Sequence, residues 1–180
     1  MPVRIPVVAL ALVLGMTCGI TAVGVLSSSR GAPTVTAPAG LAPRSPAEER
    51  GAVGALHAWD AERAAAWARG DAAALSRLYV PGSAAGAADV ALLHRYAARG
   101  LVVRGLRMQV LRARVLVMRP RRLVLEVTDR LAGAVATDLH GVSVARPLPV
   151  DRPTDHRLAL RRLGGRWLMA TVSASGSGGR

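Results

Sequence analysis

Asp129 is the carboxylate whose setting in the sequence most favours chemistry. If residues 123–131 form a strand, every second side chain points to the same face. Asp129 would then share one face with the apolar side chains of Leu123, Leu125, Val127 and Leu131. A lone carboxylate among apolar side chains costs free energy unless it is paired or protonated. Asp129 can therefore be a pocket base with a raised pKa, or it can pair with Arg63, which falls in the apolar arc of a predicted helix. The third interpretation is a solvated residue where the strand ends or bulges.

Two tyrosines are further candidates for a pocket. Tyr79 and Tyr96 can donate hydrogen bonds into a cavity, although their helical spacing favours core packing with the hydroxyl at the rim. Together with Asp129 and Arg63 they are the candidate pocket residues. We assign no catalytic residue, because the sequence has no G-x-S-x-G nucleophile elbow and no other complete catalytic pattern.

Acid–histidine pairs give a weaker signal. Asp138 and His140 would share one face of a strand, and an aspartate next to a histidine can orient a general base. A glycine follows that pair and a proline precedes Asp155–His156, so we expect both pairs in exposed turns. The other histidines, expected as isolated and solvated positions on helices, are His57 and His94.

Missing motifs argue against metal and nucleotide chemistry. The sequence has no H-E-x-x-H, no C-x-x-C and no Asp-rich calcium loop, so we expect no metal site. All 24 Lys+Arg residues are Arg, which excludes a phosphate-loop lysine. A single cysteine excludes an intramolecular disulfide. We therefore expect no cofactor.

The chain is strongly basic, with a formal net charge of +13. Five aromatic residues are too few for a nucleic-acid stacking platform, and no nucleic-acid motif is present. Guanidinium groups match phosphate and carboxylate, so anionic lipid or an envelope polymer fits better, and a solvated basic surface without a dedicated partner remains the simplest alternative. The densest cluster consists of Arg104, Arg107, Arg112, Arg114, Arg119, Arg121 and Arg122.

An uncharged apolar run covers residues 5–26. As a helix it would span about 33 Å, enough to cross a bilayer core. We expect residues 1–4 to be cytoplasmic, 5–26 to be a transmembrane helix or signal-anchor, and the following domain to be extracytoplasmic in a single-pass protein of the cell membrane. Secretion after signal cleavage is the alternative, although signal peptides usually have shorter apolar regions. Cys18 follows a poor lipobox and is interpreted as a small apolar residue.

A Pro/Ser/Ala-rich tether is expected over 27–44 and a folded domain over 45–172. Ser45, Pro46 and Glu48 form a capping box, which predicts a helix that ends at Arg69 before Gly70. Shorter helices are predicted over 72–79 and 83–99. The last residues, 173–180, are expected to be disordered.

From residue 101 the apolar period changes from 3.6 to 2, which indicates strands. The phase of the alternation reverses near Leu111–Arg112, so we expect a bulge or bend there. A second strand is predicted over 123–135 and a terminal hairpin over 155–172, while 140–149 is a strand edge or a loop. Helices that precede strands predict an α+β fold, with three helices on a curved antiparallel sheet of about four strands.

Two stretches resemble the nuclear transport factor 2-like superfamily, which includes ketosteroid isomerases and polyketide cyclases. W-A-R-G-D-A-A-A-L-S-R-L-Y-V-P at Trp67–Pro81 is similar to its helix, Gly-Asp turn and aromatic before proline. L-R-R-L-G-G-R-W-L-M at Leu160–Met169 looks like its last hairpin. The resemblance covers about 45–172 and implies a cone-like fold with a pocket, but no reaction. Anchor, tether and domain together resemble membrane-tethered actinobacterial proteins of unknown function.

Three functions remain open at this point. The first is a non-enzymatic binding, scaffold or accessory module of the cell envelope with a protein partner, which an exposed apolar sheet face would favour. The second is a small-molecule pocket protein or isomerase/cyclase-like enzyme with Asp129 as base, which a desolvated carboxylate inside the cone would favour. The third is an Arg-rich surface that docks on anionic lipid or envelope polymer.

Overall fold

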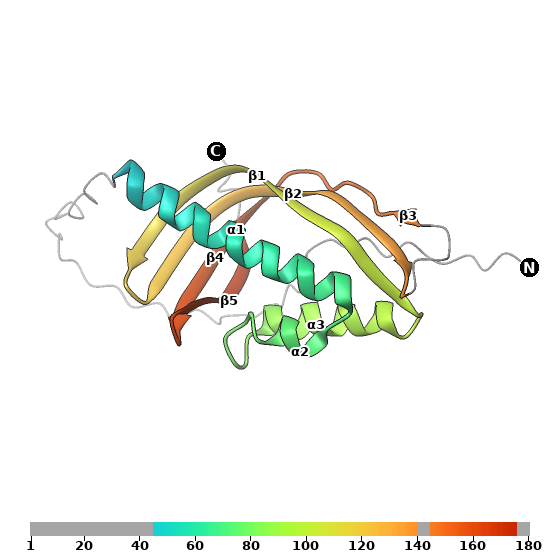
Figure 1. The fold of residues 1–180 in the computed structure, drawn as a ribbon. Helices are drawn as coiled ribbons and strands as arrows, with labels where there is room; N and C mark the ends of the chain where they lie inside the picture. Colours follow the sequence, from blue (N-terminus) through green and yellow to red (C-terminus); the bar gives the residue numbers. More distant parts are fainter. Residues whose placement is uncertain (1–44, 140–144, 176–180) are drawn as a thin grey trace, which may run out of the picture.

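The computed structural model describes residues 45–139 and 145–175, and in these ranges it contains three helices and five strands. The elements are α1 (Pro46–Arg69), α2 (Ala72–Ser76), α3 (Ala84–Ala97), β1 (Leu101–Arg119), β2 (Arg122–Asp138), β3 (Arg146–Pro147), β4 (Thr154–Leu163) and β5 (Arg166–Ala174). Figure 1 shows α1 lying along the concave side of a curved sheet, with α2 and α3 on the same side. The predicted α+β class is confirmed, and the short strand β3 brings the sheet to five strands.

The ends of α1 follow from local sequence chemistry. The Ser45 hydroxyl accepts a hydrogen bond from the Glu48 amide, and the Glu48 carboxylate accepts one from the Ser45 amide, so the predicted capping box is present. At the other end Gly70 has a φ of 66°, a left-handed conformation that glycine adopts without strain. The helix is thus 24 residues long and spans the concave side of the sheet.

The sheet is antiparallel, with the order β1-β2-β4-β5. One edge of β2 pairs first with β4, from Arg122 to Asp129, and later with β3, at Val135 and Ala136. Asp129 is therefore the residue at which the pairing with β4 ends. The candidate carboxylate lies beside this break in the pairing, on a strand whose other edge pairs with β1.

β1 is bent by irregular pairing with β2. The register shifts between Val110 and Arg112, where the phase reversal in the sequence predicts a bulge. Further shifts occur on both sides of Arg107 and between Val115 and Val117. Bulges bend a strand and increase its twist, so they account for the strong curvature of the sheet in Figure 1.

The core fills the space between the helices and the concave face. Its fully buried side chains include Leu56 and Trp67 of α1, Leu93 of α3, and Leu125 and Leu160 of the sheet. The chain after α2 also pairs with β5, because the Val80 amide donates to the Met169 carbonyl at 2.9 Å. That contact explains why α2 ends at Ser76, short of the predicted end.

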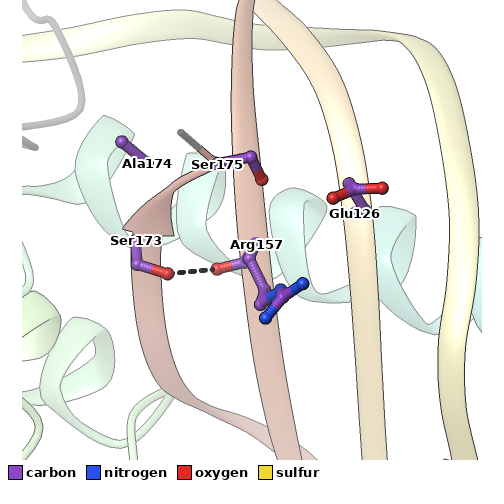
Figure 2. Close-up of a pocket in the computed structure, with 5 residues that line it drawn as sticks. All are labelled: Glu126, Arg157, Ser173, Ala174 and Ser175. Carbon is purple, nitrogen blue, oxygen red and sulfur yellow. Dashed lines mark hydrogen bonds between the residues drawn. The ribbon is translucent and has the colours of Figure 1, made fainter. Parts of the chain in front are cut away.

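In the described part of the chain all three helices lie on the concave side, which leaves the opposite, outer face of the sheet without a helix. Figure 2 shows that outer face with the helices behind the strands. Side chains alternate along a strand, so the residues next to inward-pointing ones point outward. Glu126, Arg157 and Ser173, which are paired across β2, β4 and β5, are examples on the outer face.

Several predicted boundaries change or lie outside the described residues. β5 runs to Ala174, so the predicted disordered tail begins too early. The predicted membrane segment 5–26, the tether 27–44 and His140 lie outside the described residues. Within 45–139 and 145–175, no helix is both long and apolar enough to cross a membrane.

Candidate functional site

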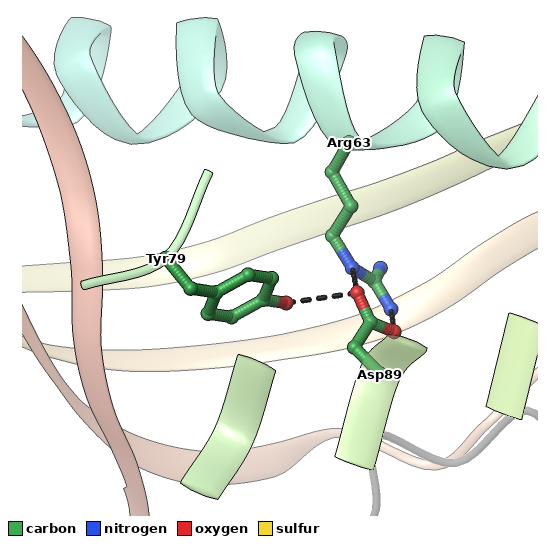
Figure 3. Close-up of polar contacts among 3 residues, drawn as sticks. All are labelled: Arg63, Tyr79 and Asp89. Atoms are coloured by element: carbon green, nitrogen blue, oxygen red, sulfur yellow. Dashed lines mark hydrogen bonds and ion pairs between the residues drawn. The ribbon is translucent and has the colours of Figure 1, made fainter. Parts of the chain in front are cut away.

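A buried ion pair links α1 to α3. Arg63 is 3% exposed and binds Asp89 in a bidentate manner, from Nε to Oδ2 at 2.7 Å and from Nη2 to Oδ1 at 2.6 Å. The Tyr79 hydroxyl donates a third hydrogen bond to Asp89 Oδ2 at 2.8 Å (Figure 3). The charge of Arg63 is thus neutralised inside the core by a carboxylate with three charge-assisted bonds.

The surroundings of this triad fix its protonation state. Burial alone lowers the pKa of Arg63, but the attraction of Asp89 outweighs it and leaves the pKa above its ordinary value. Burial raises the pKa of Tyr79, so its phenol stays neutral and keeps its proton for Asp89. The ring of Trp59 meets that of Tyr79 edge-on at 5.4 Å.

The triad corrects the predicted pairing of Arg63 with Asp129. The partner is Asp89, a residue that the sequence analysis did not single out. Its helical spacing was one available signal, because Asp89, Leu92, Leu93 and Tyr96 follow the i, i+3, i+4, i+7 pattern of one helix face. Arg63 was another, because a cation in an apolar arc requires a buried anion somewhere in the fold.

Asp129 lies on the concave face of β2, as the alternating row predicts, and is 9% exposed. Across the sheet it faces Val110 of β1 and Thr154 of β4. Its Oδ1 lies 3.3 Å from Nε2 of His156, which is 5% exposed. The interpretation of Asp129 as a solvated residue is therefore wrong for this structure, and its partner is a histidine.

The site around Asp129 holds two carboxyl groups of raised pKa. Burial raises the pKa of Asp129 to about 7, and the nearby carboxylate of Asp60 adds to the rise while Arg63 opposes it. Asp60 is a half-buried residue of α1, and burial raises its pKa to about 6 against the pull of Arg63 and His57. Near neutral pH Asp129 is therefore a mixture of acid and carboxylate, next to a mostly ionised Asp60.

His156 is neutral in this setting, because burial lowers its pKa against the opposing effect of Asp155. Its Nδ1 is buried and has no hydrogen-bond partner among the described residues. The expectation that Asp155–His156 forms an exposed pair is thus half wrong. Asp155 is exposed and accepts a hydrogen bond from the Thr128 hydroxyl, whereas His156 alternates with Leu158 and Leu160 and points into the core.

The predicted core packing of the tyrosines is present, but the Tyr79 hydroxyl is buried against Asp89 and does not lie at a rim. Tyr79 and Tyr96 are core residues, 6% and 5% exposed, and the Tyr96 ring packs edge-on against Trp67. His57 and His94 are exposed. In the described ranges no group of three or more potential metal ligands is close enough to hold an ion.

The seven clustered arginines are all exposed. Six of them lie on β1 or at the start of β2, and Arg121 lies in the turn between these strands. Beside them is a shallow pocket of about 200 Å³, lined by Glu126, Arg157, Ser173, Ala174 and Ser175 (Figure 2). This pocket belongs to the outer face and is separated from Asp129 by the thickness of the sheet.

Comparisons with known proteins find solved structures that are similar to this chain in their backbone arrangement. No protein-family model and no curated protein matches the sequence. The intermembrane-space region of the chloroplast protein ARC6 is 18% identical, covers 74% of this chain and 100% of its own, and has a TM-score of 0.49.

Two bacterial structures give similar values. A Catenulispora acidiphila protein is 14% identical, with 70% and 91% of the two chains covered and a TM-score of 0.45. A nuclear transport factor 2-like family protein from Streptomyces avermitilis is 12% identical, with 72% and 99% covered and a TM-score of 0.42. At such scores the likeness carries no conclusion about activity, and what is established is the α+β architecture, three helices on a curved antiparallel sheet.

Proposed function

We propose that the concave side of the sheet carries an acid–base site for a small, largely apolar molecule, with Asp129 as the group that accepts and returns a proton. One observation supports this proposal above the others. Asp129 is a buried carboxyl group of raised pKa that lies beside a neutral histidine and feels the charge of Asp60, and it has no ion pair with an arginine among the described residues.

The physical argument starts from the pKa. A general base works best when its pKa lies near the working pH, because it is then often ionised and still basic enough to take a proton. Burial and the charge of Asp60 supply that condition for Asp129. A buried carboxylate that only stabilises the fold is expected to pair with a cation, as Asp89 pairs with Arg63.

His156 adds a hydrogen-bonding group to the site. If Nε2 donates to Asp129, Nδ1 becomes a buried acceptor without a donor, and such a group costs free energy. A hydroxyl or amide of a bound molecule would satisfy it. The neighbours Val110, Val127 and Leu131 are apolar, so the remainder of such a molecule would also be apolar.

The place of action is part of the same proposal. The apolar run 5–26 would hold the domain at the cell membrane, and the tether 27–44 would connect it to α1 on the extracytoplasmic side. A scaffold role through an apolar sheet face gains less support, because the outer face is rich in arginine instead.

The test uses a substrate that needs only a desolvated carboxylate base. Ring opening of 5-nitrobenzisoxazole transfers the proton on C3 to the base while the N–O bond breaks to give a phenolate. We expect the full chain to catalyse this reaction with a rate that rises through about pH 7, and Asp129→Asn to lose about 100-fold or more.

Glu126→Gln is the matched control, because Glu126 belongs to the same strand and points to the opposite face. Its rate should equal that of the parent chain. Equal rates for the parent and Asp129→Asn, both folded, would contradict a base at this position.

A further inference from the structure

The outer face of the sheet is a continuous basic surface, which we call the outer arginine face. Its members come from three adjacent strands and point away from the helices by the alternation of the paired rows. They are Arg104, Arg107, Arg112, Arg114 and Arg119 of β1, Arg122 and Arg130 of β2, and Arg157 and Arg161 of β4.

Acidic side chains neutralise little of this surface. Among the paired outward rows of these strands the acids are Glu126 and Asp155. Glu126 lies 3.6 Å from Arg114, and the pair is weak because Arg114 is exposed and Glu126 only half-buried. Asp155 accepts from the Thr128 hydroxyl instead of from an arginine. The face therefore keeps a large positive excess across the sheet.

We propose that the outer arginine face docks on an anionic lipid bilayer. Guanidinium groups match lipid phosphates in shape and charge, and each basic residue near an anionic membrane surface strengthens binding about fivefold. The shallow pocket beside them places the guanidinium of Arg157 on the same face, next to Ser173, whose hydroxyl donates to the Arg157 carbonyl (Figure 2).

The bend of β1 carries an exposed apolar side chain near these arginines in the sequence. Leu111 lies at the register shift between Val110 and Arg112 and is 48% exposed. An exposed leucine directly before Arg112 in the chain is unfavourable on a purely aqueous surface. It suits the boundary between headgroups and acyl chains, where a shallow apolar contact adds to the electrostatic attraction.

The length of the undescribed chain also favours a bilayer over a soluble polyanion. The described residues begin at Ser45, and the residues from 27 to 44 would behave as a tether with a mean reach of about 25 Å. If 5–26 spans the membrane, the face is held within reach of lipid at high effective concentration. A nucleic acid would lack aromatic side chains to stack on at this face.

The experiment uses the full chain with Cys18→Ser and a single new cysteine, reconstituted in liposomes. An environment-sensitive dye is attached at Leu111→Cys, and the control chain carries it at Ala61→Cys, an exposed position of α1 on the opposite side. Liposomes contain phosphatidylcholine alone or with about 30% phosphatidylglycerol. We expect the dye at 111 to brighten and shift to shorter wavelength with phosphatidylglycerol, and to revert in about 0.5 M NaCl.

Arg→Gln variants test whether the outer arginine face is the surface that binds the lipid. Arg107→Gln/Arg112→Gln/Arg114→Gln should abolish the shift at 111, by lowering docking about 100-fold. Arg50→Gln/Arg77→Gln/Arg95→Gln removes the same charge from exposed positions of the helical side and should leave it unchanged. Matching circular dichroism spectra would show that both variants fold.

Three results would overturn the proposal. The first is a dye signal at 111 that is the same in both lipid mixtures. The second is an equal loss in both triple variants, which would indicate net charge rather than this face. The third is a shift caused by added polyphosphate but not by phosphatidylglycerol, which would identify a soluble phosphate polymer as the ligand.

Discussion

The domain buries two aspartates in opposite ways. Asp89 is held by Arg63 and Tyr79, and all of its close partners stabilise a negative charge. Asp129 faces a neutral histidine and the carboxylate of Asp60, so its surroundings favour the protonated form. The same side chain is therefore an ion-pair partner in one place and a carboxyl group of raised pKa 40 positions later.

The difference distinguishes a carboxylate that stabilises the fold from a carboxyl group that is suited to a reaction, within one core. A paired carboxylate such as Asp89 joins α1 to α3 through its ion pair with Arg63. A carboxyl group whose burial is not compensated costs stability in its ionised form, and such groups occur most often where a reaction or ligand needs them. Four predictions test this contrast, from the largest effect to the smallest.

Removal of the charge of Asp89 should have the largest effect. Asp89→Asn leaves Arg63 buried without a counterion, so we expect the free energy of unfolding to fall by about 3–5 kcal/mol. Denaturant titration measures this value. The double variant Arg63→Met/Asp89→Leu should recover part of the loss. A loss of less than about 1 kcal/mol would mean that Arg63 is hydrated in solution.

Removal of the charge of Asp129 should raise the free energy of unfolding, whereas removal of the charge of Asp89 should lower it. Folding raises the pKa of this group from 3.8 to about 7, so the folded state binds its proton more tightly and loses stability as the pH rises through that window. Asp129→Asn should raise the free energy of unfolding by about 2 kcal/mol near pH 8, a value reduced for partial solvent screening, and should add little below about pH 4. Unchanged stability at both pH values would contradict the burial of this carboxyl group.

The hydroxyl of Tyr79 should contribute less than the ion pair. Tyr79→Phe removes one hydrogen bond to a charged acceptor but leaves Arg63 and Asp89 paired, so we expect a loss of about 1–2 kcal/mol. Thermal unfolding at two pH values measures it, and the loss should be the same at both. A pH-dependent loss would indicate that the triad titrates, as the Asp129 site does.

The smallest predicted effect is a shift in the pKa of Asp129. Asp60→Asn removes a negative charge that helps to keep Asp129 protonated, so the pKa of Asp129 should fall by less than about one unit. Carboxyl carbon NMR follows that titration directly. An unchanged pKa would mean that burial alone sets it.

The sequence predicted the parts of the fold that depend on near neighbours. The capping box at Ser45, the stop at Gly70 and the bulge near Leu111 all depend on a few consecutive residues, and all three are present. The placement of Asp129 on the concave face followed from the alternation of β2. These features need no knowledge of which elements meet.

The partners of the buried charges could not be predicted in the same way. Arg63 and Asp89 meet only because the fold brings α1 and α3 to the same side of the sheet, and Asp129 meets His156 only because β2 pairs with β4 in one particular register. The alternation of His156, Leu158 and Leu160 in the sequence does indicate that this histidine shares the inward face of β4. Gly86 is another residue whose role depends on a distant partner: glycine is a poor helix former, yet a Cβ at this position would lie 2.6 Å from the Tyr79 ring.

The bulges of β1 have a consequence beyond the curvature that they produce. β1 is an edge strand of 19 residues, long enough to recruit strands from other chains into a growing sheet. Its interrupted register offers a foreign strand only short stretches of regular hydrogen-bonding groups, and its outward arginines repel a second copy of the same edge. Copies crowded together on one surface would therefore resist edge-to-edge aggregation.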